Sequence, residues 1–225
     1  MTDFDLTAFA RQCGVAEPER FAARCEILRQ FLETANRSVN LTRITEPVPF
    51  AVKHVADSLS AVTAMPELAT AELAVCDMGC GAGFPSLILA LAFPQLRITS
   101  VDSTRKKIDF VNAAARELGL TGLTAVQGRS NELNRNAGWR HRFDCVTARA
   151  VAESPKLALE ASELPRPDGC FLFYKTPDQV AGEMPVLAGL SRKLGREWYA
   201  GPVFSLPLDG GERQFIRSGK KELQR

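Results

Sequence analysis

A glycine-rich stretch, Asp77 to Pro85, constrains the fold of this chain more than any other feature. It reads Asp-Met-Gly-Cys-Gly-Ala-Gly-Phe-Pro and follows the short apolar segment 73–78, which has the character of a strand. The apolar segment 85–93 that comes next is typical of a helix, with Pro85 in its first turn, where a missing N–H costs little. A strand, a glycine turn and a helix in this order let a ligand approach the backbone closely. The stretch therefore predicts a ligand-binding loop in an α/β fold.

The chain beyond this loop keeps alternating between strand and helix patterns. Thr104 is a good N-cap for the helix that follows the second strand, and Gly119 is a good stop for it. This alternation predicts an α/β protein with a mostly parallel sheet and helices on both faces. The further strands are expected at 97–101, 123–126, 143–147, 169–175, 197–204 and 213–217, and the further helices at 104–118 and 178–194.

The first 70 residues have a helical pattern instead. We expect a loop over 36–49 and a second helix over 50–62, with a boundary near Pro66. The sequence thus predicts an N-terminal helical extension, 1–70, in front of a sheet domain, 71–225, the two forming one unit. The side chains with the three- and four-residue spacing of an amphipathic helix are Phe21, Cys25, Leu28, Phe31 and Leu32.

Three details narrow the ligand of the glycine loop. Phe84 stands where a dinucleotide fingerprint has its third glycine, which disfavours close approach of a pyrophosphate. Asp77, two residues before Gly79, can hold an ammonium or support the loop through hydrogen bonds. Asp102 ends the next strand, 19 residues beyond Gly83, where an acid usually holds ribose hydroxyls. An adenosine with an amino-acid tail fits this set, so we predict S-adenosylmethionine (AdoMet); the alternative is that both acids only cap loops.

Composition excludes several other classes. The chain has 225 residues, a net charge of +2, six scattered cysteines and two histidines, so neither a general affinity for nucleic acid nor a zinc site is indicated. No apolar run approaches the roughly 20 residues that span a bilayer. We expect a cytoplasmic protein without membrane or metal partners, and nothing in the sequence demands more than a monomer.

The chain resembles the bacterial small-subunit rRNA guanine-N7 methyltransferase G family, also called glucose-inhibited division protein B. The resemblance covers about residues 20–220 and begins with the glycine loop and Val101 to Lys107. The matches outside this cofactor core are the more specific ones. They are Asn40-Leu41-Thr42, His54, Asp57-Ser58-Leu59, Ala148-Arg149-Ala150, and Leu208-Asp209-Gly210 followed by Arg213.

The resemblance implies a seven-stranded, Rossmann-like AdoMet-methyltransferase fold with an N-terminal helical extension. The implied activity is methylation of N7 of one guanine in a loop of 16S rRNA, free or in the small ribosomal subunit. Two departures from the family pattern, Thr176 after Lys175 and Ser130-Asn131 in place of an acid, predict altered contacts rather than lost binding. Loop and resemblance together place Asp77, Gly79, Gly81, Gly83, Phe84, Asp102, Ser103, Thr104, Ser130, Asn131 and Arg149 at the cofactor, and His54, Lys106, Arg149, Lys175 and Arg213 at the RNA.

The implied reaction needs little from the protein beyond positioning. Guanine N7 carries a free lone pair at neutral pH, so no general base is required and no catalytic dyad is expected. For His54, a buried polar anchor of the extension is as good an interpretation as substrate contact, and most basic side chains are expected on a solvated face. The alternatives are an AdoMet methyltransferase acting on a small molecule or protein, a non-catalytic AdoMet- or nucleotide-binding module, and a nicotinamide dehydrogenase, which Phe84 disfavours.

Overall fold

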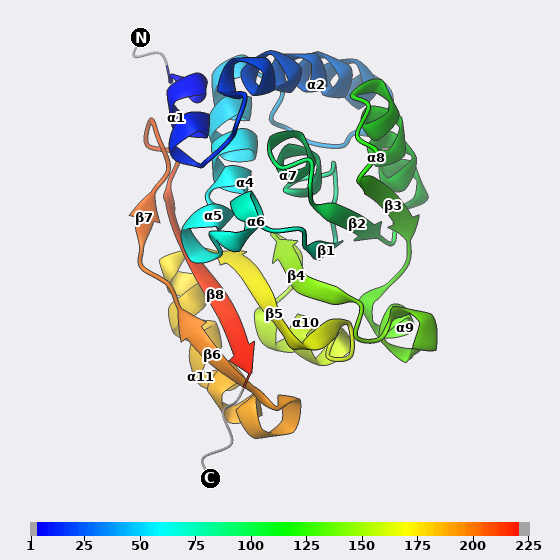
Figure 1. The fold of residues 1–225 in the computed structure, drawn as a ribbon, viewed down its shortest axis with the longest axis vertical. Helices are drawn as coiled ribbons and strands as arrows, with labels where there is room; N and C mark the ends of the chain where they lie inside the picture. The colour runs from blue at the N-terminus through cyan, green and yellow to red at the C-terminus, as the bar shows by residue number, and fades with distance from the viewer. Residues whose placement is uncertain (1–3, 221–225) are drawn as a thin grey trace.

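Seven strands follow the order β3-β2-β1-β4-β5-β8-β6 in the sheet of the computed structural model, which describes residues 4–220 (Figure 1). Strands β1 to β5 run parallel, whereas β8 runs antiparallel to both β5 and β6, and the short β7 pairs with β8. This confirms the predicted mostly parallel sheet. The strands are β1 (Ala74–Met78), β2 (Arg97–Asp102), β3 (Leu123–Gln127), β4 (Phe143–Arg149), β5 (Pro165–Lys175), β6 (Arg196–Ala200), β7 (Phe204–Ser205) and β8 (Glu212–Lys220).

Helices cover both faces of the sheet, as predicted (Figure 1). On one face α7 and α8 pack against β2 and β3, and α2 lies across these two helices. On the other face α11 packs against β6 and β8, and α10 lies between α11 and α9. These helices are α2 (Pro18–Val39), α7 (Ser86–Ala92), α8 (Arg105–Glu117), α9 (Ser130–Arg135), α10 (Ser154–Glu160) and α11 (Pro177–Leu194).

The two faces have separate apolar cores, because successive side chains of a strand point to opposite sides. Val75 of β1 belongs to the core under α2, α7 and α8, whereas Cys76 and Met78 belong to the core under α10 and α11. The N-terminal helices share the first of these cores, since Leu28 and Leu59 are buried in the same cluster as Leu87. Among the described residues, the extension therefore has no apolar core of its own. The division of the chain at residue 70 stays a prediction.

The N-terminal helices differ in their bounds from the prediction. Helix α2 runs to Val39, so the expected loop from Asn36 was placed too early; Asn40, in the left-handed conformation (φ 56°), ends the helix. The next helical segment begins at Pro47 rather than at 50, because proline is well suited to the first helical turn. The remaining helical segments are α1 (Leu6–Gln12), α3 (Pro47–Phe50), the π-helical η1 (Ala51–Ala56), α4 (Asp57–Leu59), α5 (Ala61–Ala64), α6 (Glu67–Thr70) and the 3-10 segment η2 (Ala137–Trp139).

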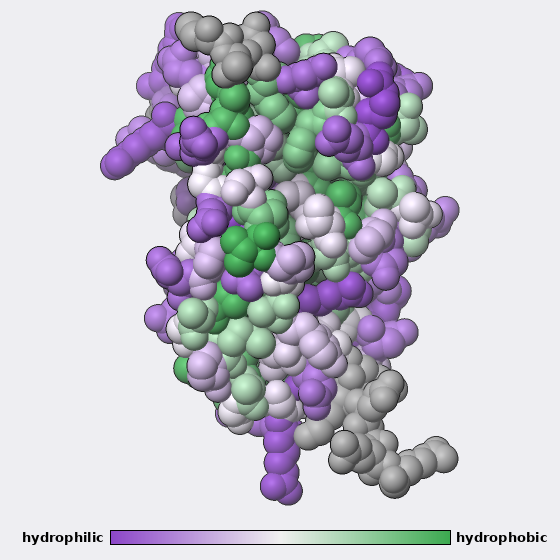
Figure 2. Space-filling model, turned by 90° about the vertical axis from the view of Figure 1, so that its left-hand side faces the viewer, coloured by the Kyte–Doolittle hydropathy of each residue, from purple (hydrophilic) through white to green (hydrophobic). Residues whose placement is uncertain are grey.

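The surface mixes polar and apolar side chains. On the face seen in Figure 2, green hydrophobic patches lie between purple hydrophilic side chains rather than forming one belt. The large exposed hydrophobic residues come from separate elements, such as Val186 on α11 and Tyr199 on β6. Within residues 4–220, no helix combines the length and the apolar character that a membrane span would need.

Candidate active site

The glycine loop leaves β1 at the carboxyl end of the sheet and is tied to the end of β2. The backbone N–H of Gly79 donates to the carbonyl of Val101 over 2.7 Å. Gly79, Gly81 and Gly83 have φ values of 71°, 57° and 86°, a region that favours glycine. A Cβ at Gly79 would lie 2.5 Å from Cγ2 of Val151, so this glycine also permits a close approach of the chain after β4.

Asp102, at the end of β2, holds the loop from the other side. Its Oδ2 accepts a hydrogen bond from the N–H of Gly81 over 3.1 Å, and its Oδ1 accepts one from the N–H of Thr104 over 2.8 Å. The ammonium of Lys107 lies 3.7 Å from Oδ2. These contacts fix the carboxylate at the sheet edge, where an acid can accept hydrogen bonds from ribose hydroxyls.

A first cavity of about 440 Å³ opens beside this loop. Its volume lies within the range of roughly 300–1,000 Å³ that small-molecule sites have. The cavity sits at the carboxyl ends of parallel strands, where open α/β sheets bind their ligands. Six of the sequence-predicted cofactor residues line it, namely Gly79, Asp102, Ser103, Thr104, Ser130 and Asn131.

Asp77 does not line this cavity but lies behind the loop. It is buried, its Oδ2 accepts a hydrogen bond from the hydroxyl of Ser86 on α7, and its Oδ1 has no hydrogen-bond partner among residues 4–220. Burial raises the pKa of its carboxyl to about 6, although the Ser86 hydrogen bond opposes this. Of the two roles considered for Asp77, support of the loop therefore fits the geometry, and direct contact with an ammonium does not. Gly81 and Gly83 also lie outside the lining of the cavity.

A second cavity, of about 410 Å³, adjoins the first at Ala150, which lines both. It lies between the N-terminal helical segments and the ends of β4 and β5. Ala150 has a φ of 55°, so the chain turns sharply after β4 at the point where the two cavities meet. The residues that line this second cavity are Ile44, Lys53, His54, Asp57, Arg149, Ala150, Tyr174, Lys175, Thr176, Gln179 and Arg213.

Asp57 joins two arginines in the wall of the second cavity. Its Oδ2 lies 2.9 Å from Nη1 of Arg149, and its Oδ1 lies 3.0 Å from Nε of Arg213. The Asp57 side chain is only 5% exposed, so solvent screens these ion pairs weakly. The sequence prediction placed Arg149 at both the cofactor and the RNA; it lines the second cavity and not the first.

Phe84 and His54 stack beneath the same cavity. Their ring centroids lie 4.1 Å apart with an interplanar angle of 4°, and the Arg149 guanidinium lies 5.8 Å from the Phe84 ring. Phe84, expected at the cofactor, is buried and lies outside the lining of the first cavity. It connects the glycine loop to the second cavity through His54.

His54 is neutral in this setting. Burial, and next the positive charge of Arg149, lower the pKa of its imidazole to about 3. Its Nδ1 lies 3.3 Å from Nη2 of Arg149 and its Nε2 lies 3.3 Å from Oγ1 of Thr42. Because the guanidinium can only donate, we assign the proton to Nε2, which donates to Thr42. His54 therefore anchors the extension and also lines the second cavity, and its contact with substrate stays a prediction.

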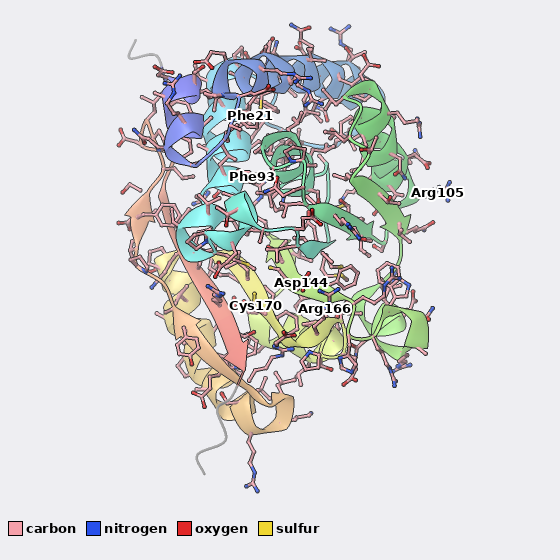
Figure 3. All side chains as sticks on the ribbon, in the orientation of Figure 1. Phe21, Phe93, Arg105, Asp144, Arg166 and Cys170 are labelled. Carbon is pink, nitrogen blue, oxygen red and sulfur yellow. The ribbon has the colours of Figure 1, made fainter. Side chains whose placement is uncertain are left out.

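The basic residues expected at the RNA are placed differently from one another. Lys175 is 7% exposed, and its ammonium donates to the carbonyl of Ala152 over 3.0 Å and to Glu183 over 2.9 Å. Lys106 is exposed and lines neither cavity, whereas Lys107 lines the first. Arg105 points away from the strands (Figure 3) and pairs with an acid on its own helix. Neighbouring helical side chains face different sides, so Lys106 and Lys107 differ in this way, and contact of Lys106 with RNA stays a prediction.

Sequence reasoning missed several residues of the first cavity. Ser130 donates its hydroxyl hydrogen bond to Glu160 over 2.6 Å, so an acid from α10 meets the wall where the family pattern has one after β3. The short helix α10 has no clear periodic pattern in the sequence, so Glu160 was not predicted. In the second cavity, Asp57 was singled out only through the family resemblance. The cavity residues not predicted as cofactor contacts are Met78, Val101, Lys107, Gly128, Arg129, Ala150, Val151, Lys156, Leu157 and Glu160.

This strand order, with a cavity at the carboxyl ends beside a glycine loop, defines the class of AdoMet-dependent methyltransferases. The fold is shared with an O-methyltransferase from Bacillus cereus in complex with SAH, at a TM-score of 0.60 and 14% identity, over 87% of this chain and 91% of that one. It is also shared with the YcgJ protein from Bacillus subtilis, at a TM-score of 0.55 and 18% identity, over 72% and 99% of the two chains.

Sequence comparison gives the family. Residues 22–184 match the family model of rRNA small subunit methyltransferase G. Proteins of that name from Limosilactobacillus reuteri (strain DSM 20016) and Leuconostoc mesenteroides are 44% and 34% identical to this chain; the matches cover 83% and 96% of it, and 78% and 90% of those proteins. The chain belongs to the rRNA small subunit methyltransferase G family. It is an AdoMet-dependent methyltransferase, as predicted, and AdoMet is its cofactor.

Proposed function

We propose that this enzyme transfers the methyl group of AdoMet to N7 of one guanine in a loop of 16S rRNA, free or within the small ribosomal subunit. The name of its relatives supports ribosomal RNA of the small subunit as the substrate. The observation that carries the proposal is the meeting of the two cavities at Ala150. In this proposal the first cavity holds the cofactor and the second receives the guanine.

The first cavity suits the parts of AdoMet. Asp102 is placed to accept hydrogen bonds from the ribose hydroxyls, with Ser103 and Thr104 beside it. Ser130 and Asn131, which also line this cavity, would flank the adenine. Gly79 leaves the backbone free of a side chain where the methionine part passes from the first cavity toward Ala150. The bound cofactor supplies an electrophilic methyl group on a sulfonium.

The second cavity suits an acceptor that has no proton to lose. Apart from the cationic side chains, the described residues that line it include three that could act as a proton acceptor, and all three are engaged. His54 accepts from Arg149, Asp57 pairs with two arginines, and Tyr174 donates to the carbonyl of Ser58 over 2.9 Å. Burial also raises the pKa of Tyr174 and lowers that of His54, so both stay neutral. A nucleophile with a free lone pair, such as guanine N7, needs none of them as a base.

Positive charge around the second cavity suits RNA. Lys53, Arg149 and Arg213 line it, and basic side chains hold phosphates or donate to guanine O6 and N7. The groove that displays N7 in an RNA helix is too deep and narrow for side chains to read. The guanine must therefore lie in a loop or leave its stack to reach the cavity. Positioning and orientation then supply the rate enhancement.

Labelled methyl transfer tests the proposal. The enzyme and AdoMet labelled in the methyl group are incubated in three separate reactions. One contains 16S rRNA, one contains small subunits from a strain lacking the enzyme, and one contains RNA-free cell extract. We expect label in RNA, and loss of this label for Arg149→Ala. Label only in a small molecule or protein would replace the proposal with another methyltransferase activity. Binding of AdoMet without any transfer would indicate a non-catalytic module.

A further inference from the structure

The wall between the two cavities is held from behind by a nearly buried ion pair. After β4, residues 150–154 turn past both cavities and lead into α10. Lys175, at the end of β5, lies 2.9 Å from Glu183 on α11, and their side chains are 7% and 12% exposed. Both residues also form hydrogen bonds with the backbone of residues 150–154, which we call the wall.

Each end of this pair holds a different point of the wall. The ammonium of Lys175 donates to the carbonyl of Ala152 over 3.0 Å. Glu183 uses Oε1 for Lys175 and Oε2 to accept the N–H of Ser154 over 2.9 Å, at the start of α10. Ser154 is fully buried. The pair thus fixes two backbone positions only two residues apart.

The fixed segment reaches the cofactor cavity both directly and through α10. Val151 lies over Gly79, so close that a Cβ on that glycine would come within 2.5 Å of it. Helix α10, which begins at Ser154, brings Leu157 and Glu160 to the lining of the same cavity. A shift of the segment would therefore change the shape of the cofactor cavity and move its border with the second cavity.

The same contacts argue against Lys175 as a phosphate ligand. Its charge is already matched by Glu183, and its ammonium is committed to two acceptors. Drawing the ammonium toward a phosphate would leave the Glu183 carboxylate without its cation in a nearly dry place, which is costly.

We propose that Lys175 and Glu183 form a positioning pair that sets the wall between the cofactor and substrate cavities, and that neither contacts the RNA. This rests on the proposed function, which assigns the first cavity to AdoMet and the second to the substrate. The effect on AdoMet belongs to the first cavity and can be measured without RNA.

Glu183→Gln tests the pair with little change of shape. Glutamine has one acceptor oxygen where glutamate has two, so it cannot serve both Lys175 and the N–H of Ser154. AdoMet affinity is measured by calorimetry without RNA, methyl transfer in a single turnover with 16S rRNA, and RNA affinity by filter retention. We expect AdoMet affinity to fall about tenfold or more, as for loss of a hydrogen bond to a charged group. Transfer slows as well, while RNA affinity is unchanged.

Asp144→Asn is the matched control. Asp144 also bridges a backbone N–H, that of Ala74, and a basic side chain, that of Arg166, but it does so near the starts of β4 and β5, as the labelled side chains in Figure 3 show. The same loss of one acceptor there should leave AdoMet affinity unchanged. If Glu183→Gln binds AdoMet as tightly as Asp144→Asn does, the proposal is overturned.

Two Lys175 variants separate positioning from RNA contact. Lys175→Arg keeps a cation that can donate to both acceptors, so it should retain most of the AdoMet affinity. This conservative variant keeps the test valid if the other variants fail to fold. Lys175→Met combined with Glu183→Gln should weaken AdoMet no more than the worse single change, because both act through one contact. Weaker RNA binding by Lys175→Met with normal AdoMet affinity would instead make Lys175 an RNA ligand. If the proposed RNA substrate is wrong, the measurements of AdoMet affinity remain valid, because they are made without RNA.

Discussion

The imidazole of His54 lies flat on the phenyl ring of Phe84, with ring centroids 4.1 Å apart and an angle of 4° between the rings. His54 comes from the π-helical segment of the N-terminal extension, a kind of irregularity that is frequent at functional sites. Phe84 ends the glycine loop of the cofactor domain. This one contact joins the helical extension, the glycine loop and the second cavity, so the extension contributes to the proposed site.

The neutral state of His54 gives a pH dependence of stability. Because burial lowers its folded pKa to about 3, below the unfolded value of about 6.5, the stability it contributes is complete above pH 6.5 and is lost as the pH falls toward 3. The free energy of unfolding, measured by urea at several pH values, should therefore fall less steeply for His54→Gln than for the parent. The difference in slope should approach about 1.4 kcal/mol per pH unit below pH 6. Parallel slopes would show that His54 is not buried as a neutral group.

Removal of the acid between two arginines should cost much stability. Asp57→Ala leaves Arg149 and Arg213 without their shared carboxylate in a mostly buried place. Breaking such a pair by deleting one partner costs about 3–5 kcal/mol. Chemical denaturation measures this, with Asp178→Asn, an exposed acid on α11, as the control that should change little. A loss of the same small size in both variants would contradict the proposed role of Asp57.

Two glycines of the same loop should differ in their tolerance of alanine. Both have positive φ, but a Cβ at Gly79 meets Val151 at 2.5 Å, whereas one at Gly81 meets nothing within 4 Å. Gly81→Ala should cost only the left-handed strain, roughly 1–2 kcal/mol of stability. Gly79→Ala should in addition displace the wall of the cofactor cavity and weaken AdoMet binding in calorimetry. Adding Val151→Ala should restore part of that binding; equal AdoMet affinities of the two alanine variants would show that Val151 does not matter.

Asp102→Ala should weaken AdoMet through the ribose. Loss of hydrogen bonds to a charged group of this kind is worth about 1.5–3 kcal/mol, so calorimetry should show a drop in affinity of roughly 10- to 150-fold. Asp109→Asn, an exposed acid on α8 that pairs with Arg105, is the control and should bind normally. Since Asp102 also holds the N–H groups of Gly81 and Thr104, the comparison should include Asp102→Asn, which retains one acceptor. Normal affinity of both Asp102 variants would remove this residue from the site.

The sequence predicted the sheet and the gathering of loop and strand-end residues at one edge of it, because these depend on local patterns. Apolar runs marked the strands, and the carboxyl ends of parallel strands meet at one edge, which brings Gly79 and Asp102 to the same cavity. The position of Asp77 behind the loop could also have been predicted, because side chains alternate between the two faces of a strand. It lies between Cys76 and Met78, which face the α10 side, so its own side chain faces α7 and Ser86.

The second cavity could not be predicted in the same way. Its central contacts join Asp57 to Arg149 and to Arg213, residues 92 and 156 positions apart, and no local pattern encodes such pairs. The end of α2 was misplaced because Asn36 has turn-forming character, yet its side chain bonds to the backbone of Thr42 from within the helix. Long-range packing decided the first case, and hydrogen bonds across six residues decided the second.

The central claim, transfer to guanine N7, is tested most directly by the chemical identity of the product. Small subunits or 16S rRNA methylated by the enzyme are treated with borohydride and then aniline, which cleaves RNA at 7-methylguanosine, and the nucleosides are analysed by mass spectrometry in parallel. The account predicts scission at a single guanine in a loop, with one 7-methylguanosine per RNA and neither product for Arg149→Ala. Methylated nucleoside of another kind, or label in the RNA without scission, would contradict it.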